Sequence, residues 1–329
     1  METITLNQFL LQGGRILHNL EVVYKIVGRP LGSAPLVVIN HALTGNADLA
    51  SENGWWKEQV GYEKSVDLNE YCVLSINIPG NGFGNLSNED FENYRDFSVR
   101  DIAAIFWEVL FKLEVQEVFA LIGPSLGGCI AWEMLALQSK RIQNFIAIAS
   151  HYKPSDWLIA NVHIQDILLS RNETVNDARK HAMLLYRSPE SLREKFQTSR
   201  NSDSYYKVEE WLNFHGDQLQ KRFSLSSYKL MNHLLRTGKA LEKENFQNFS
   251  KDVSTMIHLV GIDSDLLFRD REIYNSALEM QQSKSNVFYH QIQSIHGHDA
   301  FLIENNQVSK ILKSVLNTQK SHNYVNSNN

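Results

Sequence analysis

The sequence is poor in cysteine. Its 329 residues include only two, Cys72 and Cys129, which cannot form a disulfide framework and do not stand at a metal-ligand spacing. Both lie in apolar segments, where cysteine behaves as a small buried residue. We therefore expect a reducing, cytoplasmic environment and no metal site.

The sequence also lacks long apolar runs and an excess of positive charge. Its first residues, METITLNQ, have neither the basic nor the apolar region of a signal peptide. No apolar run approaches the roughly 18–20 residues that cross a bilayer. The net charge of −5 provides no basic surface for nucleic acid. We therefore expect neither a membrane nor a nucleic acid as a partner.

What the sequence does contain is an alternation of short apolar runs with segments of helical periodicity. Segment 98–113 has helical spacing, with Ser98 as a candidate N-cap and Asp101 three residues later. Around His18-Asn19, the sequence is consistent with a hairpin. The alternation predicts an α/β fold, with a mostly parallel sheet and helices on both faces. The runs that predict buried strands are residues 35–40, 71–78, 118–123, 144–150, 254–262 and 286–292.

The strand pattern is interrupted after Ser150. From about residue 152 to residue 249 the sequence is helix-like, polar and rich in aromatic residues, and strands resume only afterwards. An insertion between strands explains this better than a separate domain does. We therefore predict a core formed by residues 1–151 and 252–318, a helical lid formed by residues 152–251, and a polar, disordered tail formed by residues 319–329.

A serine flanked by glycines follows the apolar run VFALIG. Gly123-Pro124-Ser125-Leu126-Gly127 fits the G-x-S-x-G pattern in the strand–turn–helix context that a nucleophile elbow requires. Such a turn is strained, needs small neighbours and points the hydroxyl out above the sheet. The N–H of Leu126, at the start of the helix, would then face an oxyanion formed at Ser125.

A serine nucleophile needs a histidine base and an acid that orients the base, and in this fold both follow later strands. The chain order serine, acid, histidine is satisfied. The residue pattern alone leaves the choice open within each group, and a histidine inside a strand is the weakest candidate. The candidates are Asp263 and Asp265 after the strand at 254–262, and His290, His296 and His298 in or after the strand at 286–292.

A second oxyanion donor is expected from the loop after an early strand. His41-Ala42-Leu43 follows the run at 35–40 and is similar to an H-G-x oxyanion loop, with alanine in place of glycine. We therefore expect the N–H of Leu43 to be the second donor.

Six segments in this order resemble the homoserine O-acetyltransferase family: HALTGNAD, GWWKEQVG, FSVRDIA, GPSLGG, SDLLF and GHDAFLIE. The resemblance covers nearly the whole chain except the tail. It implies an α/β-hydrolase fold with a helical lid, and a homodimer formed through lid helices. It also implies acetyl transfer from acetyl-CoA, a substrate rather than a cofactor, to L-homoserine in methionine biosynthesis. The expected cycle has two steps, a ping-pong mechanism through Ser125.

The resemblance also implies roles for individual residues. The acid would be Asp265 of SDLLF and the base His298 of GHDAF, with Asp299 contacting the amino group of the substrate. In the lid, KRFSLSSYKL resembles a family segment whose arginine and tyrosine reach the substrate, which points to Arg222 and Tyr228. A forked cation suits a carboxylate, and a carboxylate suits an ammonium group.

Departures from the family pattern leave the substrates open. Pro124 and Leu126 stand where the family has glycine and methionine, and the segment around residues 81–88 replaces a glycine-rich stretch. The alternatives are a transferase that uses L-serine or succinyl-CoA, and a serine hydrolase (an esterase or thioesterase) that gives the acyl group to water. An inactive binding protein is disfavoured, because it would be free to lose a triad member.

Overall fold

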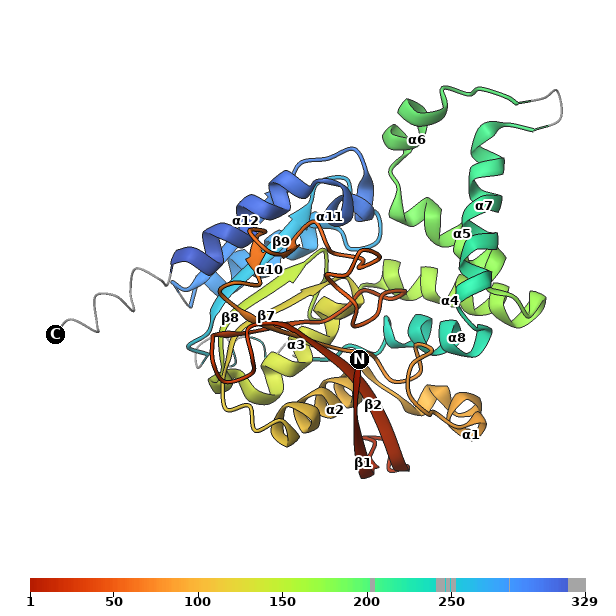
Figure 1. Cartoon of the computed structure of the whole chain (residues 1–329). Coiled ribbons are helices and arrows are strands. Elements are labelled where there is room, and N and C mark those ends of the chain that lie inside the picture. The colour runs from red at the N-terminus through yellow and green to blue at the C-terminus, as the bar shows by residue number, and fades with distance from the viewer. Residues whose placement is uncertain (202–204, 241–245, 247–248, 250–252, 284, 319–329) are drawn as a thin grey trace.

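An eight-stranded sheet forms the centre of the computed structural model, which describes residues 1–201, 205–240, 246, 249, 253–283 and 285–318 (Figure 1). The strand order is β1-β2-β6-β3-β7-β8-β9-β10. The first two pairings in this order are antiparallel and the other five are parallel. The strands are β1 (Glu2–Leu10), β2 (Ile16–Gly28), β3 (Leu36–Ile39), β6 (Cys72–Ile76), β7 (Val118–Pro124), β8 (Ile142–Ile148), β9 (Met256–Ile262) and β10 (Val287–Ile292), with a separate pair β4 (Val60–Gly61) and β5 (Val66–Asp67).

Apolar side chains cover both faces of the sheet. On β3, Val38 belongs to one apolar cluster, while Val37 and Ile39 belong to another. The alternation follows from the two-residue repeat of a strand and explains why the run is apolar at every position. Helices α2, α3 and α10 contribute to the first cluster, and α12 to the second. The helices of the core are α1 (Asn88–Glu92), α2 (Val99–Lys112), α3 (Leu126–Gln138), α10 (Asp270–Gln281), α11 (Ala300–Ile303) and α12 (Asn305–Thr318), with short 3-10 turns η1 (Tyr94–Asp96), η2 (Ser139–Arg141) and η3 (Gly297–Asp299).

This architecture confirms the predicted fold class. All six predicted strands are present, but β10 is buried only at Val287 and Ile292, because it lies at the edge of the sheet. The predicted N-cap is also confirmed: the Ser98 hydroxyl accepts from the N–H of Asp101, whose carboxylate accepts from the N–H of Ser98. No helix in the described part of the chain is both long and apolar enough to cross a membrane.

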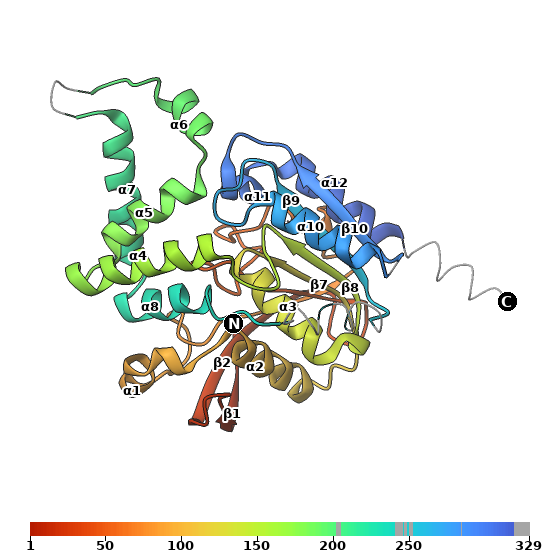
Figure 2. The ribbon, with the colours of Figure 1, turned by 180° about the vertical axis from the view of Figure 1, so that it is seen from behind.

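In the part of the chain that the structure describes, five helices lie between β8 and β9, in the segment predicted to be an insertion. In both views α5, α6 and α7 stand out from the body of the molecule (Figures 1 and 2). The predicted end of the lid at residue 251 and the predicted disordered tail, residues 319–329, lie outside the described residues. The five helices are α4 (Asp156–Asn172), α5 (Val175–Tyr186), α6 (Pro189–Phe196), α7 (Lys207–Arg222) and α8 (Leu225–Leu234).

The first hairpin lies earlier in the chain than the sequence suggested. Its turn is between β1 and β2, where the N–H of Leu11 donates to the carbonyl of Arg15 over 2.9 Å. Asn19 lies inside β2, with a φ of 50°. Asparagine tolerates this left-handed conformation, so it bends the strand locally without ending it. The prediction at His18-Asn19 was wrong because β1 is mostly exposed and has little apolar signal.

The corner between β7 and α3 is tightly packed. A Cβ atom added to Gly123 would lie 2.3 Å from the carbonyl oxygen of Gly127 and 2.6 Å from the nitrogen of Gly128. Real Cβ atoms do not approach backbone atoms so closely, and backbone cannot rotate away as a side chain can. Glycine at position 123 therefore allows the helix to start directly above the strand.

We predict that Gly123→Ala lowers the free energy of unfolding by about 1–3 kcal/mol, the usual cost of overpacking a filled site. Urea denaturation of the purified protein measures this change. Gly13→Ala is the matched control, because its Cβ would meet only the carbonyl oxygen of Asp96 at 3.8 Å, and we expect it to change stability by less than about 0.5 kcal/mol. Equal effects of the two substitutions would contradict the close packing of this corner.

Candidate active site

Ser125 lies at the corner between β7 and α3 in a strained backbone conformation. Its φ is 55° and its ψ is −127°, a combination that costs a non-glycine residue on the order of 1–3 kcal/mol. The surrounding backbone holds it there: the Ser125 N–H donates to the carbonyl of Ile148 over 2.9 Å, and its own carbonyl accepts from the N–H of Gly128 over 2.8 Å. The side chain is not used to cap the helix, so its hydroxyl is directed elsewhere.

The hydroxyl of Ser125 is within hydrogen-bonding distance of the His298 imidazole, which is in turn within hydrogen-bonding distance of the Asp265 carboxylate. The Nε2 atom of His298 lies 2.8 Å from Ser125 Oγ, and its Nδ1 atom lies 2.7 Å from Asp265 Oδ2. All three residues are buried. Because a carboxylate can only accept, Nδ1 carries the proton and donates it to Asp265, which leaves Nε2 to accept from the serine hydroxyl. This is the arrangement that a general base requires.

The second carboxylate oxygen of Asp265 is hydrogen-bonded to the backbone. Its Oδ1 atom accepts hydrogen bonds from the backbone N–H groups of Leu267 and Phe268, at 2.7 and 2.9 Å. The carboxylate therefore cannot rotate freely, and Oδ2 stays directed at the imidazole of His298. The SDLLF segment supplies both the acid and the two amides that orient it.

The other candidates from the sequence do not reach the serine hydroxyl in this structure. Asp263 accepts from the N–H of Ser294 over 2.9 Å, and so joins the two loops that follow β9 and β10. His290 remains within the sheet, where its Nε2 atom lies 3.1 Å from Nδ1 of His258 on the neighbouring strand. The structure therefore brings Asp265 and His298, rather than these residues, to Ser125.

The loop that carries His298 forms hydrogen bonds with the lid. Arg187 Nη2, at the end of α5, lies 3.1 Å from His296 Nδ1, and the Ser188 hydroxyl donates to the carbonyl of Ile295. Gly297 has a φ of 69°, and a Cβ atom there would lie 2.9 Å from the nitrogen of Ser188. His296, the remaining candidate base, thus contacts the lid, and the connection from α5 to α6 packs directly on the catalytic loop.

The expected oxyanion donors come from two elements, the start of α3 and the loop after β3. Leu126 is the first residue of α3, where N–H groups have no partner within the helix. Leu43 is on the loop after β3, which a buried histidine fixes: His41 Nδ1 lies 2.8 Å from the Ala42 carbonyl, and His41 Nε2 accepts from the Ile78 N–H over 3.0 Å. Burial lowers the pKa of His41 to about 4, so this histidine is neutral and its tautomer is fixed.

The segment that departs from the family pattern begins at this loop. Asn81 is buried, and its amide nitrogen lies 3.2 Å from His41 Nε2 and 3.4 Å from the carbonyl of Gly45. It also donates to Asn77 Oδ1 over 3.2 Å. The altered segment therefore supports the backbone around Leu43, a relation that the sequence alone did not reveal.

The predicted substrate residues are placed on three different elements. Arg222, at the end of α7, donates from Nη1 to the carbonyl of Thr44 over 3.0 Å. Asp299 follows His298 directly; burial raises the pKa of its carboxyl, against the opposing effect of His298 and nearby arginines. Tyr228 on α8 is fully buried, and its hydroxyl donates to Gln165 on α4 over 2.9 Å.

A pocket of about 480 Å³ joins the oxyanion loop to the lid. Ala42 and Thr44 line it from the loop, Leu302 from α11, and Arg179 and Arg222 from the lid. A ligand in this pocket would lie beside Ala42, which precedes Leu43, and beside Leu302 of α11, the helix that follows His298 in the chain. Arg179 and Arg222 are cationic and no lining residue in the described part of the chain is acidic, which favours an anionic ligand.

The sequence analysis missed the aromatic and cationic residues around His298. The ring of Tyr186 lies 5.6 Å from the His298 ring, and those of Phe268 and Phe301 lie at 5.7 and 5.5 Å. They limit access of water to the imidazole. Phe268 and Phe301 are part of the motifs SDLLF and GHDAF, but Tyr186 and Arg179 are in a lid helix whose sequence shows no comparable motif.

Comparison with known proteins agrees with this architecture. Residues 35–302 match the family described as the alpha/beta hydrolase fold. The chain is 30% identical to a homoserine O-acetyltransferase of Deinococcus radiodurans over 90% of this chain and 86% of the relative. It is 27% identical to that of Methanococcus vannielii over 98% of this chain and 73% of the relative.

Solved structures show the same fold. The homoserine O-acetyltransferase from Bacillus anthracis superposes with a TM-score of 0.87 at 17% identity, covering 96% of this chain and 97% of that one. Esterase E22 superposes with a TM-score of 0.85 at 13% identity, covering 96% and 99%.

A serine on a strained strand–helix corner, above a mostly parallel sheet, defines an enzyme of the α/β-hydrolase superfamily. Within that superfamily, the chain belongs to the homoserine O-acetyltransferase family.

We predict that Asp265→Asn lowers kcat by about 10⁴-fold, as the wrong tautomer does in a serine protease triad. The two backbone N–H groups would keep the amide oxygen, so the NH₂ group would face His298 Nδ1 and force the proton onto Nε2. Thiol release from acetyl-CoA measures the loss. Asp263→Asn is the matched control, because its amide oxygen can still accept from Ser294. A similar loss in both variants would contradict the assignment of Asp265.

Proposed function

We propose that the protein transfers an acetyl group from acetyl-CoA to the side-chain hydroxyl of L-homoserine. The observation that carries this proposal is the hydrogen-bonded series Ser125–His298–Asp265 in a chain that is 30% identical to a homoserine O-acetyltransferase. The proposal places the protein in methionine biosynthesis in the cytoplasm. The buried state of both cysteines is consistent with that compartment.

In the first half-reaction, Ser125 Oγ attacks the thioester carbonyl while His298 Nε2 accepts its proton. Asp265 stabilises the imidazolium that forms. The N–H groups of Leu43 and Leu126 donate to the oxyanion of the tetrahedral intermediate. When the intermediate collapses, the C–S bond breaks and the thiol of CoA leaves with the proton from His298. The acetyl group remains as an ester on Ser125.

In the second half-reaction, His298 accepts the proton of the acceptor hydroxyl, whose oxygen attacks the acetyl ester. The same two N–H groups hold the second oxyanion. Collapse of this intermediate breaks the bond to Ser125 Oγ, which regains a proton from His298. The products are free enzyme and the acetylated amino acid, so donor and acceptor react in turn, in a ping-pong cycle.

The acceptor would be held by its two charged groups. Arg222 can bind the carboxylate through its forked donors, and Asp299 can bind the ammonium group. Tyr228 would border the acceptor from the lid, where the charge of Arg179 acts on it. A bound acceptor beside Ser125 has a high effective concentration, and the aromatic residues around His298 exclude water. These features favour transfer over hydrolysis.

A serine hydrolase is the second candidate, because solved structures of this fold include esterase E22 and the acetyl esterase MekB. It would use the same serine, histidine and aspartate, and only the acceptor would differ.

We predict that L-homoserine strongly stimulates thiol release from acetyl-CoA, with formation of O-acetylhomoserine. The assay compares release with L-homoserine, with L-serine and with neither, and uses Ser125→Ala as the inactive control. Parallel wells contain succinyl-CoA.

Each outcome separates one alternative. Equal release with and without an amino acid would identify a hydrolase. Stimulation by L-serine alone would keep the mechanism and change the acceptor. Activity confined to succinyl-CoA would keep the mechanism and change the donor.

We further propose that the protein forms a homodimer through its lid helices. Large apolar side chains are exposed on three of them: Ile164 of α4, Leu184 of α5 and Phe214 of α7 are 46%, 47% and 56% exposed. Exposed apolar side chains on projecting helices are typical of a contact surface.

The dimer predicts a mass of about twice 37.8 kDa in sedimentation equilibrium, and a shift toward the monomer in Phe214→Asp. Tyr62→Asp, at an exposed aromatic residue of the core, is the control and should leave the mass unchanged. A monomeric wild-type protein at all concentrations would refute the dimer.

A further inference from the structure

Two arginines of the lid enter the pocket beside the oxyanion loop. Arg179 is on α5 and Arg222 is at the end of α7, two helices that pack against one another. Both line the pocket of about 480 Å³ that Ala42 and Leu302 border on the side of the core. Neither the family motifs nor the spacing of the sequence points to Arg179.

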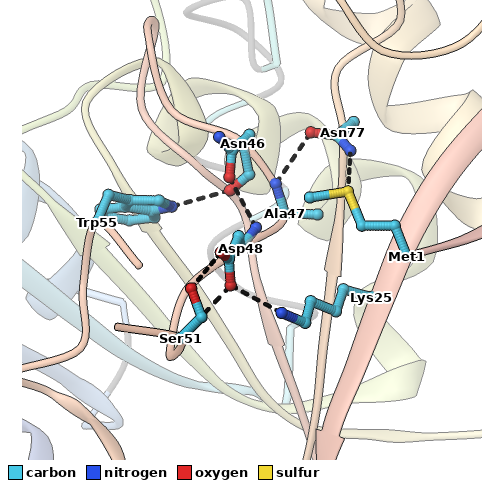
Figure 3. A network of polar contacts seen from close by, with 8 residues as sticks. All are labelled: Met1, Lys25, Asn46, Ala47, Asp48, Ser51, Trp55 and Asn77. Atoms are coloured by element: carbon cyan, nitrogen blue, oxygen red, sulfur yellow. Dashed lines mark hydrogen bonds and ion pairs between the residues drawn. The ribbon is translucent and has the colours of Figure 1, made fainter. Parts of the chain in front are cut away.

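The wall of the pocket opposite the lid is rigid. Trp55 and Asn46 both line the pocket, and the Trp55 indole N–H donates to the Asn46 carbonyl over 2.9 Å. Figure 3 shows how this loop continues into a polar network: the Ala47 N–H donates to Asn77, and Asp48 is paired with Lys25 at 2.8 Å. The pocket is therefore shaped before a ligand arrives, which lowers the entropic cost of binding.

Neither guanidinium group forms a salt bridge with a carboxylate in the ranges that the structure describes. Arg222 donates to the Thr44 carbonyl, and the guanidinium of Arg179 lies 5.2 Å from the centre of the Tyr186 ring. Burial and the charge of Arg179 both lower the pKa of Arg222, so an anion between the two guanidinium groups would stabilise both charges.

Arg179 also interacts electrostatically with the three predicted substrate residues. Its charge acts on Asp299, on Tyr228 and on Arg222. Through Tyr186, whose ring lies 5.6 Å from that of His298, it is one side chain away from the base.

We propose that Arg179 is a specificity-determining residue that binds the α-carboxylate of the acceptor together with Arg222. This inference rests on the proposed transfer to an amino acid. One carboxylate between two guanidinium groups removes their repulsion and receives donors from two sides. Asp299 then remains for the ammonium group. The acceptor is thereby defined as a hydroxy amino acid with a free carboxylate, and an amide or ester of it is discriminated against.

The test compares Arg179→Met with the wild type on L-homoserine and on L-homoserine amide. We expect KM for L-homoserine to rise about 10- to 100-fold in the variant, the loss of a charge-assisted hydrogen bond. KM for the amide should be almost unchanged, so the preference for the acid disappears. Formation of the acetyl-enzyme from p-nitrophenyl acetate, measured as a burst without acceptor, should be unaffected. Arg193→Met on the exposed side of α6 is the matched control.

Several results would overturn the inference. Equal losses with the acid and the amide would show that Arg179 does not bind the carboxylate. A smaller burst rate would show that it acts on His298 through Tyr186. A rise in KM for acetyl-CoA that is absent with S-acetyl-N-acetylcysteamine, which has no phosphate, would assign Arg179 to the donor. A wild-type enzyme that no amino acid stimulates would refute the proposed function itself, whatever the variant does.

Discussion

The hydrogen bond between His298 and Ser125 joins residues 173 positions apart, and the order of the strands makes it possible. β7, β8, β9 and β10 are neighbours in the sheet in the same order as in the sequence. The loops after parallel strands emerge at one edge, so the residues after β7, β9 and β10 meet there. The serine, the acid and the base occur in this order because each follows its own strand of the same sheet.

The same order of strands determines where the lid lies. The helical insertion leaves the sheet after β8 and returns before β9, so it starts and ends between the strand of the nucleophile and the strand of the acid. Ser188, at the start of α6, contacts the loop of His298, and Arg222, at the end of α7, contacts the loop of Leu43. The lid therefore touches both the base and the predicted oxyanion loop, and a displacement of its helices would change the geometry of the site.

The sequence predicted those parts of the site that depend on residues close together in the chain. A tight strand–helix corner needs Gly123, and the SDLLF segment contains both Asp265 and the amides that orient it. The residue pattern could not choose between His296 and His298, because the choice depends on how the loop packs against Arg187. Arg179 and Tyr186 were missed since contacts between lid helices depend on packing angles, which a helical periodicity does not specify.

Whether the acyl group goes to water or to an amino acid does not depend on the triad, which is the same in both reactions. It depends on which side chains line the site next to the acetyl ester of Ser125. Three aromatic rings surround the His298 imidazole, so bulk water has limited access, while two arginines and Asp299 provide charges of both signs for a zwitterion. An acetyl group needs none of these charges. We propose that they bind a second substrate, because a hydrolase whose second substrate is water would bury them at a cost and gain nothing from them.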